Sequence, residues 1–260
     1  MSVKFLLSFV SYYFSSKSVH DAHSNYLYNF IRAVFLDVNP YPDYDIAKNY
    51  RKQLLNDATL ISSPPLGAKP QLKTSSIAQL TESTAKQHKY AKVLYLLIQY
   101  CKPKNIIELG TATGVSALYQ ALARPSAKVH TLDGNIQLLE IVKGKFAQMN
   151  IQNVEFIPGL FDNTFPALLN KLQTVDYIFF DGNHTYDATI NYFETALPHI
   201  HNKTIFIFDD INWSGEMQRA WKEICEHSST TLCIDIFMMG IVLFDTSLAK
   251  QTFVCRYWFF

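Results

Sequence analysis

The chain has 260 residues, of which 48% are hydrophobic and 17% are charged, a composition typical of a folded globular protein rather than a disordered one. With 23 Lys and Arg against 22 Asp and Glu, the formal net charge is +1, which argues against the broad basic surface of a protein that binds duplex nucleic acid. The four cysteines form no C-x-x-C pair, so the sequence excludes a zinc ribbon and predicts reduced thiols in a cytoplasmic protein.

The first 70 residues have apolar residues at helical spacing. One stripe is Tyr26, Phe30, Val34 and Phe35, and the other is Ile46, Tyr50, Leu54 and Leu55. The apolar start over residues 5–10 favours a helix that packs on the surface over a signal peptide. No apolar run reaches the ~18 residues of a membrane span. We therefore expect residues 1–70 to form a helical lid or a dimer contact, ending in a Pro-rich loop over 62–70, before a second domain over 71–260.

From residue 85 onward, helical patterns alternate with short apolar runs. A helix is expected from about Ala85 to Tyr100, and another carries Ile136, Leu139, Val142 and Phe146. The expected strands are 106–109, 129–132, 154–157, 177–180 and 205–208. Strands that alternate with helices indicate a parallel sheet covered on both faces. Residues 231–237 and 241–244 are too close for a helical crossover and predict an antiparallel hairpin. The sequence thus predicts a Rossmann-like, doubly wound α/β fold with a mostly parallel, seven-stranded sheet.

The sharpest motif is Glu108-Leu109-Gly110-Thr111-Ala112-Thr113-Gly114-Val115-Ser116, between the first expected strand of the sheet and a helix. Two glycines let the backbone turn tightly and approach a ligand. The following helix N-terminus presents free N–H groups to a carboxylate or phosphate. Ala112 stands where the dinucleotide-binding pattern has its middle glycine, which weakens that interpretation. A tight turn without a ligand is the alternative.

Two further sites follow the next strands. Asp133 ends the second strand 25 residues after Glu108, close to the ~20-residue offset of a ribose-binding acid. Its alternative role, compatible with the first, is to cap the next helix. Gly159 follows the third strand, where a glycine suits an adenine that lies against the backbone.

On these motifs the sequence resembles class I S-adenosylmethionine-dependent methyltransferases, in particular the catechol O-methyltransferase-like group and a related bacterial branch, over roughly residues 72–245. The resemblance implies that Gly110 and Ser116 hold the methionine moiety and that Asp133 holds the ribose. The full set of predicted donor-binding residues is Glu108, Gly110, Thr111, Gly114, Ser116, Asp133, Gly159, Leu160, Phe161, Asp162 and Asp181. Many relatives have Asp where this chain has Leu160, which leaves Asp162 or the backbone to recognise the adenine amino group.

Carboxylates follow the fourth and fifth strands: Asp181, and the pair Asp209 and Asp210. Ligands of open α/β sheets bind beyond the carboxyl ends of the strands. Three carboxylates gathered there repel one another unless a cation or proton intervenes, and their oxygens suit Mg²⁺ or another hard divalent cation. In the family that the sequence resembles, an Asp and an Asp-Asn pair bind such a metal, and Asp210 replaces that Asn. Alternatively, Asp210 caps a helix and Asp181 bonds loop N–H groups.

His184 lies three residues after Asp181, at the place of the family's catalytic Lys. An imidazole can accept a proton near neutral pH, so His184 and Asp181 are the candidate catalytic residues. A hydrogen-bonded structural role is the alternative for His184.

The sequence therefore predicts an enzyme that moves a methyl group from S-adenosylmethionine to a hydroxyl oxygen of a small molecule, with metal assistance. A nucleic-acid methyltransferase is disfavoured by the charge and by the absence of Asn-Pro-Pro-Tyr after the fourth strand. The missing glycine and the terminal hairpin disfavour a nicotinamide-dependent oxidoreductase. An inactive module that binds S-adenosylmethionine stays open, as do the identity of the acceptor and a homodimer. No nucleic-acid partner is expected.

Overall fold

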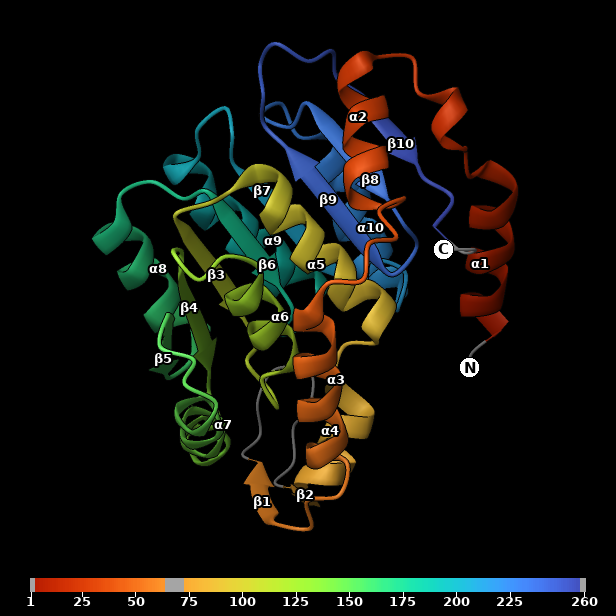
Figure 1. The fold of residues 1–260 in the computed structure, drawn as a ribbon. Coiled ribbons are helices and arrows are strands. Elements are labelled where there is room, and N and C mark those ends of the chain that lie inside the picture. Colours follow the sequence, from red (N-terminus) through yellow and green to blue (C-terminus); the bar gives the residue numbers. More distant parts are fainter. Residues whose placement is uncertain (1–2, 64–72, 258–260) are drawn as a thin grey trace. The chain divides into compact units, whose positions relative to one another are not determined.

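The computed structural model describes residues 3–63 and 73–257 (Figure 1). The chain divides into two compact units, one made of Met1–Asp37 and Leu172–Phe260 and the other of Val38–Lys171. Residues 1–70 therefore contribute to both units, and their role as a lid stays a prediction. The loop expected over 62–70 lies, from residue 64 on, outside the described residues.

The unit of residues 38–171 contains a three-stranded parallel array in the order β3-β4-β5. Its elements are α3 (Pro42–Leu54), β1 (Leu60–Ser63), β2 (Lys73–Ser76), α4 (Ile77–Thr84), α5 (His88–Cys101), β3 (Asn105–Leu109), α6 (Val115–Ala123), β4 (Lys128–Asp133), α7 (Ile136–Gln148), β5 (Val154–Pro158) and α8 (Phe161–Leu172). In register, Leu109 lies opposite Leu132, and Asp133 lies opposite Pro158. The residues that follow these three strands therefore emerge at one edge of the array.

The other unit contains five strands in the order β10-β8-β9-β7-β6. Its elements are α1 (Val3–Ser15), η1 (Val19–Asp21), α2 (Asn25–Val34), β6 (Tyr177–Phe180), α9 (Tyr186–Ala196), η2 (Leu197–His199), β7 (Ile205–Asp209), α10 (Gly215–Glu226), β8 (Leu232–Asp235), β9 (Met239–Leu243) and β10 (Gln251–Val254). Strands β6 and β7 are parallel, and β8 and β9 form the expected antiparallel hairpin.

The predicted mostly parallel α/β fold is confirmed, with two differences. The expected seven strands are one too few, because β10 pairs in parallel with β8. The antiparallel pair of β1 and β2 was also not expected. Strands β1, β2 and β10 have four residues each, and at least two of the four are polar, so none of the three reads as an apolar run.

In two of the predicted apolar stripes, one residue that was expected to be buried is exposed. Ile46 of α3 is 44% exposed and Ile136 of α7 is 58% exposed. The buried residues are instead Tyr44, Ala47, Tyr50 and Leu54 of α3, and Leu138, Leu139, Val142 and Phe146 of α7. Ile136 is the first residue of α7.

The N-terminal residues form a helix, as expected. Tyr12 of α1 donates a hydrogen bond to the carbonyl of Cys255, and its ring lies 5.2 Å from that of Phe237. The opposite side of α1 is exposed and apolar, with Leu7 and Phe14 among its residues. None of the helices in the described part of the chain has the length and apolar character that a membrane crossing requires. None of the four cysteines takes part in a disulfide in the described part of the chain.

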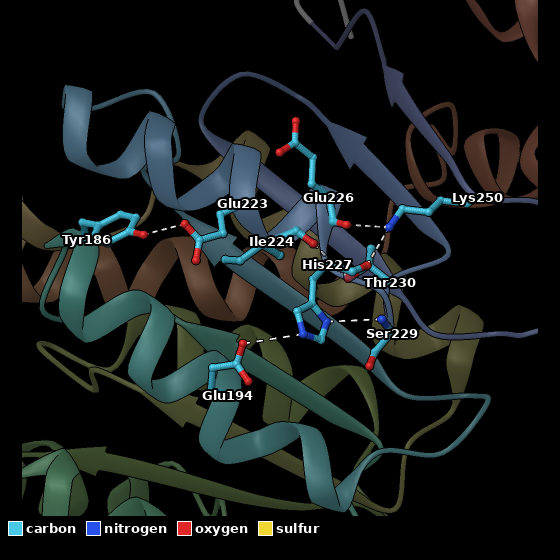
Figure 2. A network of polar contacts seen from close by, with 9 residues as sticks. All are labelled: Tyr186, Glu194, Glu223, Ile224, Glu226, His227, Ser229, Thr230 and Lys250. Atoms are coloured by element: carbon cyan, nitrogen blue, oxygen red, sulfur yellow. Dashed lines mark hydrogen bonds and ion pairs between the residues drawn. The ribbon is translucent and has the colours of Figure 1, made fainter.

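The end of α10 is fixed by a polar network (Figure 2). Lys250 Nζ donates to the carbonyls of Glu226 and His227 at 2.8 and 2.6 Å, so a cation satisfies the last carbonyls of the helix. The ring of His227 accepts from the N–H of Ser229 and lies 3.6 Å from the carboxylate of Glu194 on α9. These contacts tie α10 to α9 and to the segment before β10.

Gly240 of β9 leaves room for the ring of Trp221. A Cβ at position 240 would lie 2.5 Å from two atoms of that buried ring. We expect Gly240→Ala to destabilise the protein by about 1–3 kcal/mol, because the core there must shift. Urea unfolding measures the change. Gly215→Ala, which meets nothing within 4 Å, is the matched control and should not destabilise the protein.

Candidate functional site

The glycine loop is anchored on β4. The N–H groups of Gly110 and Thr111 donate to the carbonyl of Leu132 at 2.9 and 3.2 Å. Gly110 has φ +106°, which L side chains rarely adopt, and Ala112 has φ +45°. The loop is thus held in a left-handed conformation that turns the backbone sharply between β3 and α6. Beyond it, α6 begins with Ser116 buried in its first turn.

Gly114 is the N-cap of α6, with φ +78°. A Cβ there would lie 2.5 Å from Val142 and 3.2 Å from Phe146, both on α7. The packing of the loop against α7 therefore requires glycine at this position, whether or not a ligand is bound.

We expect Gly114→Ala to cost about 1–3 kcal/mol of stability from backbone strain alone, with a further loss from the clash with Val142. Gly144→Ala, also on α7 and with nothing within 4 Å, should instead stabilise by up to about 1 kcal/mol because alanine favours a helix. Urea unfolding of both variants measures the difference. Equal stability of the two variants would show that Gly114 is not required.

Glu108, the fourth of the five residues of β3, is fully buried. Its carboxylate accepts from Gln120 Nε2 at 2.7 Å and from Thr131 Oγ1 at 2.6 Å. Burial raises the pKa of Glu108 to about 7, although hydrogen bonds from Thr131, Ser116 and Gln120 oppose the rise. Thr111 joins this network through its hydroxyl, 2.6 Å from that of Thr131. That Glu108 and Thr111 touch a methyl donor stays a prediction.

Asp133 links the glycine loop to the start of α7. Its two carboxylate oxygens accept from the N–H groups of Ala112 and Asn135, both at 2.8 Å. Burial raises the pKa of Asp133, and these backbone bonds oppose the rise. Asn135, not Asp133, is the N-cap of α7, so the capping alternative for Asp133 is wrong. Each carboxylate oxygen has a second lone pair, so the group can still accept from ribose hydroxyls.

The third strand end carries the predicted adenine residues. Gly159 has φ +135° and donates its N–H to the carbonyl of Asp133 at 3.0 Å. Leu160 follows with 53% of its surface exposed, and Phe161 and Asp162 begin α8. An exposed leucine beside a glycine offers an apolar surface for a flat ring. The helix that carries Ile136, likewise exposed, starts at the same edge.

Sequence reasoning missed two residues near the loop. Tyr50 of α3 donates from its hydroxyl to the carbonyl of Thr113 at 2.8 Å. Thr113 Oγ1 is buried and has no hydrogen-bond partner among the described residues. A buried, unsatisfied hydroxyl in a loop of this kind is compatible with a bond to a polar ligand atom. Tyr50 carries only a core-type signal in the sequence, and the pairing of residues 63 positions apart depends on tertiary structure.

The unit of residues 1–37 and 172–260 brings the predicted acidic residues together. Asp181 follows β6, and Asp209 is the buried last residue of β7. His184 Nε2 lies 3.7 Å from a carboxylate oxygen of Asp181 and 3.9 Å from one of Asp210. The predicted cluster of Asp181, His184, Asp209 and Asp210 is thus assembled within one unit.

Asp210 has φ +54°, in the left-handed region that Asn and Asp adopt more readily than other non-glycine residues. This conformation explains why Asp can stand where relatives have Asn. The N-cap of the next helix, α10, is Ser214. The alternative that Asp210 caps this helix is therefore wrong.

The donor atoms of this cluster fit a divalent cation. One ligand atom from each of Asp181, His184 and Asp209 lies within 4.8 Å of the others. Ligands on opposite sides of Mg²⁺ are about 4.2 Å apart at its ~2.1 Å bond length. Small side-chain movements would therefore bring the three ligand atoms to the distances that one cation requires. Carboxylate oxygens with one imidazole also suit Mn²⁺ and other first-row ions. In such a set His184 is a metal ligand, a role that the sequence analysis did not give it.

Comparison with known proteins agrees with the predicted family resemblance. Residues 107–211 match a family model described as a methyltransferase domain. A catechol O-methyltransferase of Niastella koreensis is 27% identical over 129 residues, which are 48% of this chain and 58% of that protein. The chain thus spans little more than half the length of this curated relative.

Solved structures show the same fold. The O-methyltransferase from Bacillus cereus in complex with SAH is 18% identical, with a TM-score of 0.56 over 83% of this chain and 96% of that one. The O-methyltransferase TomG from Streptomyces achromogenes, involved in tomaymycin synthesis and solved with SAM, is 17% identical, with a TM-score of 0.57 over 80% of this chain and 92% of that one. The predicted resemblance to class I S-adenosylmethionine-dependent methyltransferases is confirmed.

Proposed function

We propose that this protein transfers a methyl group from S-adenosylmethionine to a hydroxyl oxygen of a small molecule. The observation that carries the proposal is the glycine loop with Asp133 bonded to its backbone, in a chain whose fold and residues 107–211 match methyltransferases. The orphaned hydroxyl of Thr113 and the left-handed turn at Gly110 support a ligand at this loop.

In this proposal the unit of residues 38–171 binds the donor. The N–H groups at the start of α6 hold the methionine carboxylate, because a helix N-terminus favours an anion. Ser116, in the same turn, lies against the methionine moiety. Asp133 accepts from both ribose hydroxyls. Gly159 and Leu160 lie against the adenine. S-adenosylmethionine supplies the methyl group on a sulfonium centre, so the protein has mainly to align the donor with the acceptor.

The unit that holds Asp181 and His184 acts on the acceptor. His184 Nε2 takes the proton of the acceptor hydroxyl. The oxygen then forms a bond to the methyl carbon, the carbon–sulfur bond breaks, and its electron pair stays on sulfur. The nearby carboxylates of Asp181 and Asp210 stabilise the imidazolium that this step leaves on His184.

Asp181, Asp209 and Asp210 would hold a divalent cation, which would favour the ionised form of the acceptor oxygen when bound. With His184 as a fourth ligand, the same cluster could not use this imidazole as a base. The cation and the two roles of His184 are separable by experiment.

The function is tested by calorimetry with S-adenosylmethionine and by transfer of a labelled methyl group to a panel of small phenols and alcohols. We expect Asp133→Asn to weaken donor binding by about 1.5–3 kcal/mol, the contribution of a charge-assisted hydrogen bond. Glu82→Gln, a change of charge in an exposed residue of α4, is the control and should bind normally. Unchanged affinity in Asp133→Asn would contradict the assigned role.

Three outcomes would favour the alternatives. Stabilisation by NAD but not by S-adenosylmethionine would indicate an oxidoreductase, since a ligand stabilises the state that it binds. Donor binding without transfer to any small acceptor, and with transfer to an oligonucleotide, would indicate a nucleic-acid methyltransferase. Donor binding with no transfer at all would indicate an inactive binding module.

A further inference from the structure

A pocket of about 320 Å³ lies between the C-terminal half of α3 and the start of α5, within the unit of residues 38–171. Its lining consists of Lys48, Arg51, Lys52, Leu55, Gln87 and His88. The four residues from α3 and its C-cap recur at the spacing that places them on one face of a helix. Both α3 and α5 pack against α6, so the walls of the pocket are held by helix packing. The volume is at the lower end of the ~300–1,000 Å³ of small-ligand sites.

The lining is strongly positive. It carries three cations and one histidine, with no acidic residue. Lys48 has an acidic partner in Asp45, at 3.6 Å, but the two side chains are 51% and 80% exposed. Such an exposed pair contributes little. Burial, and then the charges of Lys48 and Lys92, lower the pKa of His88, and the charge of Asp45 opposes this shift.

One lining residue of the pocket has a buried donor that the described part of the chain leaves unpaired. Arg51 Nε is buried and has no hydrogen-bond partner among the described residues. A buried donor on a charged group is costly to leave unpaired. The N-cap of α5, Gln87, makes no capping bond with its side chain, so the positive end of the helix dipole is at the pocket wall. The ring of His88 is held in place by a hydrogen bond between its Nδ1 and the hydroxyl of Tyr119.

We propose that this pocket binds a phosphate group, either as inorganic phosphate or as the phosphate of a small organic ester. A phosphate with two negative charges balances the positive charges of Lys48, Arg51 and Lys52 better than a singly charged carboxylate does. The planar guanidinium of Arg51 suits two phosphate oxygens, and Lys48 and Lys52 add point charges. Leu55 offers an apolar wall to the organic part of an ester. Phosphate binding in this pocket does not depend on methyl transfer.

The test is calorimetric titration of the full chain at physiological salt with inorganic phosphate, pyrophosphate and glycerol 3-phosphate. Saturable binding at one site is expected. We expect the double variant Lys48→Glu with Lys52→Glu to bind at least about tenfold more weakly, with an unchanged melting temperature because both side chains are exposed. The double variant Lys143→Glu with Lys222→Glu makes the same change in net charge at two other exposed lysines and should bind as the unchanged protein does.

Arg51→Gln provides a second test that removes the guanidinium without reversing charge, and it should also weaken binding at least about tenfold. Tighter binding of glycerol 3-phosphate than of inorganic phosphate would identify an ester as the source of the phosphate, and the reverse order would identify the free ion. The absence of saturable binding, or an equal loss in both double variants, would overturn the proposal.

Discussion

Removal of divalent cations with EDTA should reduce methyl transfer by on the order of 10³-fold, the rate equivalent of several kcal/mol of charge stabilisation. Donor binding should be largely unaffected, because the donor contacts in our proposal come from the glycine loop, Asp133 and Gly159. The measurement is transfer of a labelled methyl group before and after chelation, with recovery on adding Mg²⁺ or Mn²⁺. Full activity of a demetallated sample would reject the cation.

Variants of the acidic cluster refine this prediction. Asp181→Ala and Asp209→Ala should be as severe as chelation, since both residues offer an oxygen to the candidate metal set. Asp210→Asn should be mild. It keeps an oxygen and restores the residue type of related enzymes, and Asn tolerates the positive φ of this position as well as Asp does. A severe loss in Asp210→Asn would show that the charge of Asp210 is required.

His184→Gln separates the two roles of the histidine. As a proton acceptor, His184 is needed for turnover but not for cation affinity, so the variant should lose activity while binding Mn²⁺ normally. As a ligand, it is needed for the cation, and the loss should be overcome in part by a higher Mn²⁺ concentration. The distances from His184 to Asp181 and Asp210 are compatible with both roles.

The sequence was sufficient to predict the strands whose side chains are buried on both faces of the sheet. Strands β6 and β7 are buried at every residue, and such strands read as unbroken apolar runs. Strand β10 has only four residues, of which Phe253 alone is buried, so its pairing with β8 leaves no comparable pattern. The same limit applies to β1 and β2.

In the candidate site too, some features were predictable from the sequence and others were not. Spacing and residue type located Asp133, His184 and the acidic cluster, because ligand-binding residues follow the ends of parallel strands. The bond from Ala112 to Asp133 and the packing of Gly114 on α7 depend on how the loop folds onto its neighbours. No local pattern encodes those contacts. The role of Gly114 in packing illustrates the consequence, since the sequence alone suggests a ligand as the reason for that glycine.

Glu108→Gln should make the protein more stable above neutral pH. Burial raises the pKa of Glu108 from 4.5 to about 7 in the folded state. The folded protein therefore binds a proton more tightly than the unfolded chain does. The stability that this group contributes is fully present below pH 4.5 and is lost as the pH rises through about 7. The pKa difference corresponds to about 3 kcal/mol. A glutamine carries no charge, so the variant avoids this loss.

The amide also fits the hydrogen bonds around position 108. Its oxygen can accept from Gln120 Nε2, and its NH₂ group can donate to the hydroxyl of Thr131, which then donates elsewhere. Urea unfolding at pH 5, 6, 7 and 8 measures the effect. The free energy of unfolding of Glu108→Gln should equal or fall below that of the unchanged protein at pH 5 and exceed it at pH 8. Glu140→Gln, at an exposed residue of α7, is the control, and a parallel pH dependence in all three proteins would show that Glu108 is not the titrating group.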